Sequence, residues 1–205
     1  MADDLNISLG EPTTRALPQG KRPCEPAFAI DRVGSGEPEE PEVYLHVRAV
    51  EQVMHHMRED EEHELGGLLC GQAAEDAGGR FVTVTGAVAA TLAHGERLCL
   101  TFTHEAWDAM LAEKQRQYPG EEIVGWYHTH PGLGVFLSAP DQFIHGSFFD
   151  APTQIALVID PRTFAWGLFH WHGEELRAVQ RYFLYGPADA DMPELARLLH
   201  EYARR

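Results

Sequence analysis

Cysteine, basic residues and long apolar runs are all scarce in this sequence, and each shortage excludes a class of protein. The 3 cysteines are widely spaced and odd in number, so neither a disulfide framework nor a cysteine-based zinc site is indicated. Only 16 Lys and Arg residues stand against 32 Asp and Glu residues, which argues against nucleic-acid binding, because that needs clustered positive charge. No apolar run reaches the length of about 18 residues that a membrane span needs.

The charge balance and the first residues predict a cytoplasmic protein with a protein partner. A net charge of −16 suits solubility and attraction to a basic protein surface. The chain opens with Met-Ala-Asp-Asp, which lacks the basic and apolar regions of a signal peptide. We therefore expect a cytoplasmic location, with no membrane and no nucleic acid among the partners.

Aromatic residues are nearly missing from the first part of the chain, where Phe28 is the only one before Val43. The same segment carries 6 of the 13 prolines, and it cannot bury enough apolar surface to fold alone. We expect residues 1–41 to be a disordered tail, either an inert linker or an arm that orders on a partner. Residues 42–205 are long enough for one sizeable core but not for two.

Hydrophobic periodicity in residues 42–205 predicts alternating strands and helices. We expect an α/β protein with a mixed, curved sheet flanked by helices, because several strands are joined by short turns. The expected strands are 43–47, 64–70, 81–88, 123–130, 154–160, 164–171 and, at an edge, 177–184. The expected helices are 50–57, one capped by Thr103, one that starts at Ser138 and a last one from 191. One face of the strand 123–130 should carry Val124, Trp126, His128 and His130.

Residue types that commonly bind metals lie at the end of that strand and shortly after it. His128 and His130 are two residues apart, so both imidazoles point to one face of an extended strand. Asp141 follows across a Pro131-Gly132 turn, with enough chain to bring its carboxylate back to the same point. Two imidazoles and one carboxylate leave a tetrahedral zinc ion one open position, which is typical of a catalytic site. We predict one zinc ion held by His128, His130 and Asp141.

A second His-x-His pair, His170 and His172, shows that the spacing of two histidines is weak by itself. With 12 histidines in 205 residues, about one accidental pair is expected. Ser138 and Asp141 at fixed offsets after the first pair lower the accidental expectation to on the order of one in a thousand. The second pair is not followed by a serine and an aspartate at these offsets, so we expect His170 and His172 to be ordinary strand residues.

Each of these residues also has a simpler structural interpretation. Ser138 and Asp141 could be only a helix N-cap and a first-turn acid. The histidines could be hydrogen-bonded core residues, and Glu64 could be a surface acid beside a buried strand. All of these interpretations would have to hold together, which favours a functional site.

The stretch Gly-Trp-Tyr-His-Thr-His-Pro-Gly-Leu-Gly-Val-Phe-Leu-Ser-Ala-Pro-Asp, which ends at Asp141, resembles the motif of the JAMM (MPN-plus) zinc metalloproteases. That family also places a glutamate on an earlier apolar strand, and Glu64-Leu-Gly-Gly-Leu-Leu-Cys-Gly matches this pattern. The resemblance covers about 130 residues and implies a cytidine-deaminase-like fold. A long loop after the final strands of the proteasomal member is absent here, which favours a simpler, prokaryote-like modifier system.

The resemblance implies a zinc-dependent isopeptidase, that is, a deubiquitinase-like metalloprotease. Glu64 would take a proton from the attacking water and pass it to the leaving amine, and Ser138 would help to stabilise the oxyanion. The implied partner is ubiquitin or a ubiquitin-like protein with a carboxy-terminal glycine tail, together with its conjugates. Two alternatives stay open: a zinc hydrolase that processes a sulfur-carrier protein or a small peptide, and a non-catalytic MPN scaffold.

The segment 91–98, Thr-Leu-Ala-His-Gly-Glu-Arg-Leu, is the expected place for the substrate tail. In the family, the segment before the helix that precedes the His-x-His strand can pair with an extended tail as an added strand. Backbone hydrogen bonds would hold such a tail, and its glycines would pass where side chains cannot.

Overall fold

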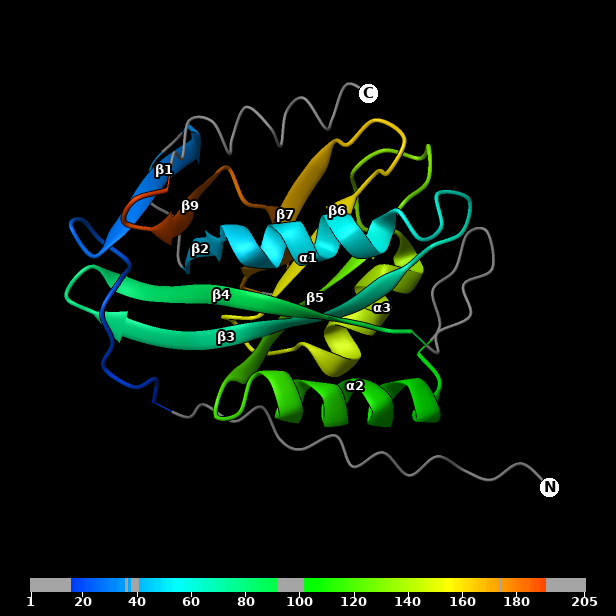
Figure 1. Ribbon diagram of the computed structural model, residues 1–205, viewed down its shortest axis with the longest axis horizontal. Helices are drawn as coiled ribbons and strands as arrows, with labels where there is room; N and C mark the ends of the chain where they lie inside the picture. Colours follow the sequence, from blue (N-terminus) through cyan, green and yellow to red (C-terminus); the bar gives the residue numbers. More distant parts are fainter. Residues whose placement is uncertain (1–15, 36, 38–40, 92–101, 174, 191–205) are drawn as a thin grey trace.

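One mixed β-sheet organises the molecule in the computed structural model, which describes residues 16–35, 37, 41–91, 102–173 and 175–190 (Figure 1). The sheet has nine strands in the order β1-β9-β2-β4-β3-β5-β6-β7-β8. The strands are β1 (Phe28–Gly34), β2 (Glu42–His46), β3 (Gly66–Asp76), β4 (Gly79–Ala89), β5 (Glu122–Thr129), β6 (Ile155–Ile159), β7 (Trp166–His172), β8 (Glu175–Ala178) and β9 (Arg181–Pro187).

Parallel and antiparallel neighbours alternate irregularly through the sheet. The parallel pairs are β2 with β4, β2 with β9, and β5 with β6, whereas the remaining pairs are antiparallel. Strands β3 and β4 form a hairpin that turns at residues 77 and 78. The α/β class with a mixed sheet, predicted from the sequence, is thereby confirmed.

In the part of the chain that the structure describes, three helices cover the two faces of the sheet. The helix α1 (Val47–Met57) packs its apolar side into one core cluster with Val84, Leu157 and Leu184. The helices α2 (His104–Gln117) and α3 (Ala139–Phe148) lie on the other side (Figure 1). There Met110 and the residue after α3, Phe149, belong to a second cluster with residues of β3 to β6. Because both faces are covered, the central strands are apolar on both sides.

A β-bulge changes which side chains of β5 share a face. The register of β5 against β3 runs from Gly125 opposite Leu69 to Ile123 opposite Cys70, so Val124 is the extra residue. Gly125 has a φ of +155°, a conformation that L-residues rarely adopt. Val124 consequently packs in the α1 cluster, whereas Trp126 packs on the opposite side. The expectation that Val124 and Trp126 share a face was wrong for this reason.

The sheet also extends into the segment that the sequence assigned to the tail. Strand β1 pairs antiparallel with β9 from Phe28 opposite Pro187 to Gly34 opposite Arg181. Phe28 and Ile30 pack on the cluster of Tyr44, Ala74, Phe81 and Tyr185. In this part of the chain the structure differs from the expectation of a disordered tail, because residues 28–34 gain backbone pairing with β9 and a cluster to pack on.

The carboxy-terminal part of the expected sheet also differs. The strand expected at 177–184 is divided between β8, at one edge, and β9, which lies between β1 and β2. The last expected helix, from 191, and residues 1–15 lie outside the described residues. Within the described residues, no helix is long and apolar enough to cross a membrane.

Candidate metal site

The end of β5 supplies the two histidines of the site. His128 pairs with Val158 of the parallel strand β6, and the His130 N–H, just past the strand, donates to the Ile159 carbonyl at 2.9 Å. Both histidines are buried, as is Thr129 between them. Since they are two positions apart on extended backbone, both imidazoles reach the same side of the sheet.

The amino-terminal end of α3 supplies the carboxylate. Ser138 is the N-cap, and its hydroxyl accepts a hydrogen bond from the Asp141 N–H at 3.3 Å. In return, Oδ2 of Asp141 accepts from the Ser138 N–H at 2.7 Å, which completes a capping box. The cap thus fixes Asp141 at a helix end where the dipole favours a negative charge.

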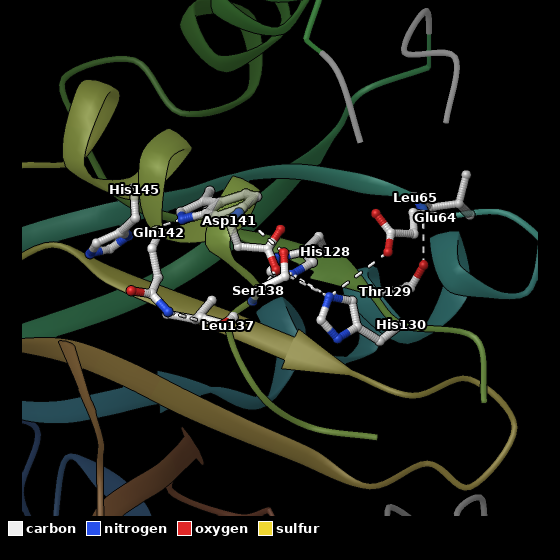
Figure 2. Close-up of polar contacts among 11 residues, drawn as sticks. Glu64, Leu65, His128, Thr129, His130, Leu137, Ser138, Asp141, Gln142 and His145 are labelled. Carbon is white, nitrogen blue, oxygen red and sulfur yellow. Dashed lines mark hydrogen bonds and ion pairs between the residues drawn. The ribbon is translucent and has the colours of Figure 1, made fainter. Parts of the chain in front are cut away.

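The three side chains converge on one point, as Figure 2 shows. The Nε2 atoms of His128 and His130 lie 3.1 Å apart. Asp141 Oδ2 lies 3.4 Å from His128 Nε2 and 3.3 Å from His130 Nε2. Bonds of about 2.0–2.2 Å to a tetrahedral ion would separate its ligands by about 3.3–3.6 Å. The ligand triangle therefore fits a tetrahedral metal ion, and this is the one metal-ligand cluster found among the described residues.

Glu64 lies beside this triangle, immediately before β3. Its Oε1 is 3.9 Å from His130 Nε2, and its side chain is only 4% exposed. Thr129 holds this segment, because its hydroxyl accepts from the Leu65 N–H and its own N–H donates to the Leu65 carbonyl, both at 2.8 Å. Glu64 lies further from His130 Nε2 than Asp141 does, 3.9 Å against 3.3 Å, which suits a group that acts beside a metal.

Burial and mutual charge act differently on the three side chains of the triangle. Burial lowers the pKa of the His128 imidazole. Burial also acts to lower the pKa of His130, but the hydrogen bond and charge of Asp141 outweigh it, so that pKa is raised. Burial acts to raise the pKa of Asp141, yet hydrogen bonds from both histidines hold it far below its ordinary value. A cation in the triangle would meet the Asp141 carboxylate and two imidazoles, each of which must be deprotonated at Nε2 to bind it.

The turn after His130 is fixed by a buried aspartate. Gly132 has a φ of +72°, and its N–H donates to Oδ1 of Asp160 at 2.9 Å. The same oxygen accepts from the Arg162 N–H at 2.9 Å. Asp160 thereby holds the chain that leads from the histidines to Ser138.

The structure brings together all five residues that the sequence singled out, and it separates the second histidine pair from them. His170 is buried and His172 is exposed, both on β7, and neither joins the metal-ligand cluster. The supporting residues Thr129 and Asp160 were missed. Thr129 carried a weak clue in its place between the two ligands, whereas nothing in the sequence pointed to Asp160.

Comparison with known proteins shows similarity to several curated proteins, among them a proteasome subunit and an NAD(+) hydrolase. The chain is 33% identical over 121 residues to the 26S proteasome regulatory subunit rpn11 of Schizosaccharomyces pombe. The matched region covers 58% of this chain and 38% of that protein. It is 52% identical over 50 residues to the NAD(+) hydrolase TcpA of a Theionarchaea archaeon. This shorter match covers 24% of this chain and 15% of that protein. The chain thus spans a minor part of both.

The solved structure supports the fold. A solution structure of a protein from Desulfitobacterium hafniense matches with a TM-score of 0.53 at 18% identity, over 73% of this chain and 96% of that one.

The family model described as JAB1/Mov34/MPN/PAD-1 ubiquitin protease matches residues 39–152, which is more than half of the chain. The matched part contains Glu64, His128, His130, Ser138 and Asp141. The chain belongs to this family.

Proposed function

We propose that this chain is a zinc-dependent protease that hydrolyses the amide bond after the carboxy-terminal glycine of a ubiquitin-like modifier. One observation carries the proposal: the triangle of His128 Nε2, His130 Nε2 and Asp141 Oδ2, with edges of 3.1 to 3.4 Å. Two imidazoles and a carboxylate are a zinc ligand set that leaves the fourth position open.

The chain's own residues divide the remaining work. Zinc bound there would supply a Lewis acid that makes water nucleophilic at neutral pH and polarises the amide carbonyl. Glu64, 3.9 Å from His130 Nε2, would take the proton of the attacking water and deliver it to the leaving amine. The Ser138 hydroxyl accepts from the Asp141 N–H, so its own proton is free to point at a developing oxyanion. No covalent intermediate with the chain is required.

The substrate class rests on family membership. The matching family is described as a ubiquitin protease, and one relative is a proteasome subunit. We extend this to a ubiquitin-like modifier whose glycine tail lies along residues 91–98, a segment that, except for Thr91, is outside the described residues. A slim tail suits the buried triangle, because glycine passes where larger residues cannot.

A direct test is incubation of the chain with fusions of candidate modifiers to a reporter, with and without a zinc chelator. The proposal predicts cleavage after the terminal glycine, loss of cleavage with chelator and recovery when zinc is restored. Cleavage of small peptides but of no modifier fusion would favour the hydrolase for a smaller substrate. Absence of any cleavage by a zinc-loaded chain would favour a non-catalytic scaffold.

A further inference from the structure

His128 is held in an unusual way for a histidine in a metal site. Such histidines almost always donate the second ring N–H to a carboxylate, a carbonyl or water, and this bond fixes the orientation of the ring. The Nδ1 atom of His128 is buried and has no hydrogen-bond partner in the part of the chain that the structure describes. His130 Nδ1 is likewise buried and without a partner among the described residues, but only the His128 ring lies flat on a buried aromatic side chain that precedes it on the same strand.

This side chain is the indole of Trp126. Trp126 precedes His128 by two residues on β5, and the two rings stack with centroids 4.4 Å apart and an angle of 15° between their planes. Trp126 is completely buried and also stacks on Phe149, at 5.7 Å and 7°. A flat contact of this kind resists tilting of the imidazole.

The indole is itself fixed by a buried histidine on α3. Trp126 Nε1 donates a hydrogen bond to His145 Nδ1 at 3.0 Å. An indole N–H can only donate, so the acceptor Nδ1 must carry no proton. Burial lowers the pKa of His145 to about 4, with the charge of His128 as a further cause, so this acceptor persists at neutral pH. His145 lies four residues after Asp141 on the same helix. The helix α3 therefore carries both Asp141, which belongs to the triangle, and the histidine that fixes Trp126.

We propose that His145 and Trp126 form a positioning pair that orients the metal ligand His128, with the helix α3 as their common support. Figure 2 shows His145 on α3, further from the triangle than Asp141. The pair touches neither substrate nor reacting atoms, so it acts through His128. The proposal rests on the metal site of the proposed function and adds two residues to it.

The same strand offers a matched control. Tyr127, between Trp126 and His128, is also buried, and its hydroxyl makes a 2.8 Å hydrogen bond to Nδ1 of another buried histidine, His56. Tyr127 packs in the α1 cluster, on the opposite side from Trp126. Tyr127→Phe therefore removes a comparable buried aromatic–histidine bond without touching the stack on His128.

The test measures zinc affinity by competition with a chromogenic chelator in four variants and the wild type. His145→Asn and His145→Leu are nearly equal in size, but only Asn offers an acceptor near the place of Nδ1. We expect His145→Leu and Trp126→Phe to bind zinc about tenfold to a hundredfold more weakly than the wild type. His145→Asn and Tyr127→Phe should stay within about threefold of it.

Cobalt substitution gives a second measurement, because the visible absorption of bound Co²⁺ reports the ligand geometry. We expect an altered band in His145→Leu and Trp126→Phe and the wild-type band in Tyr127→Phe. Equal zinc affinities and equal Co²⁺ spectra in all variants would overturn the positioning pair while leaving the proposed function intact. Absence of zinc binding by the wild type would instead overturn the proposed function. If His145→Leu does not fold, Trp126→Phe against Tyr127→Phe decides the matter.

Discussion

In the proposed mechanism, Glu64 is the residue that would distinguish a hydrolase from a module that only binds metal. It is buried 3.9 Å from His130 Nε2, yet it is not part of the three-residue ligand cluster. A carboxylate at this distance can serve as a proton carrier for water in the open coordination position. The same side chain would be a fourth ligand if it moved inward, and this would close the site. The two roles predict different behaviour of one substitution.

Glu64→Gln tests the role as a base. Gln has nearly the same shape but cannot accept the proton, so the variant should retain zinc and lose roughly 10² to 10⁴ in rate. Zinc content and kcat on a modifier fusion are the measurements, and Glu62→Gln, an exposed position two residues earlier, is the control. Loss of zinc from Glu64→Gln would make Glu64 a ligand. Wild-type turnover would remove it from the mechanism.

At the scale of elements, α3 joins a structural cap to a functional ligand. The interpretation of Ser138 and Asp141 as a helix cap and their interpretation as site residues were stated as alternatives. The structure shows the capping box with Oδ2 of Asp141 turned to both histidines, so the geometry supports both interpretations at once. The cap places the ligand, and a change in the cap should therefore affect the site.

Ser138→Ala should show this coupling. Loss of the cap hydroxyl should cost about 1 kcal/mol of stability, and loss of the oxyanion donor should also lower kcat. Thr103→Ala is the matched control, because Thr103 caps α2 by accepting from the Ala106 N–H at 3.1 Å. Denaturant unfolding and steady-state kinetics of both variants decide the matter. An equal loss of kcat in Ser138→Ala and Thr103→Ala would mean that Ser138 acts only as a helix cap.

The segment 91–98 carries the prediction for substrate capture. Ala93→Pro removes an amide donor and fixes φ, so strand addition by a substrate tail should be damaged without loss of zinc. Measured kcat/KM should fall on a protein conjugate but not on a short peptide, and Ala93→Ser, which keeps the amide, should resemble the wild type. Unchanged cleavage of the conjugate by Ala93→Pro would contradict tail pairing and favour a smaller substrate.

For the whole molecule, the sequence predicted local structure better than the arrangement of distant strands. The helix caps at Thr103 and Ser138 and the strand with both histidines were predicted because their causes are local: a capping hydroxyl and a period of two. The place of β9 between β1 and β2 was not predicted, since pairing between distant segments leaves no periodic trace. The same holds for β1, whose stability depends on β9.

The candidate site shows the same division. Glu64, His128, His130, Ser138 and Asp141 could be named because their types and offsets form a motif. The residues that support them could not be named, since the hydrogen bonds from Gly132 to Asp160 and from Trp126 to His145 join residues 28 and 19 positions apart. The bulge at Val124 was also hidden, because one extra residue in a strand has no compositional mark.

The zinc content of the purified chain tests the central claim most directly. Metal analysis should give one zinc per wild-type chain and none in His128→Ala, because two protein ligands do not hold the ion. His172→Ala, which removes an exposed histidine of the other His-x-His pair, should keep the full complement. A full zinc complement in His128→Ala, or the loss of zinc in His172→Ala alone, would contradict the assignment of the site.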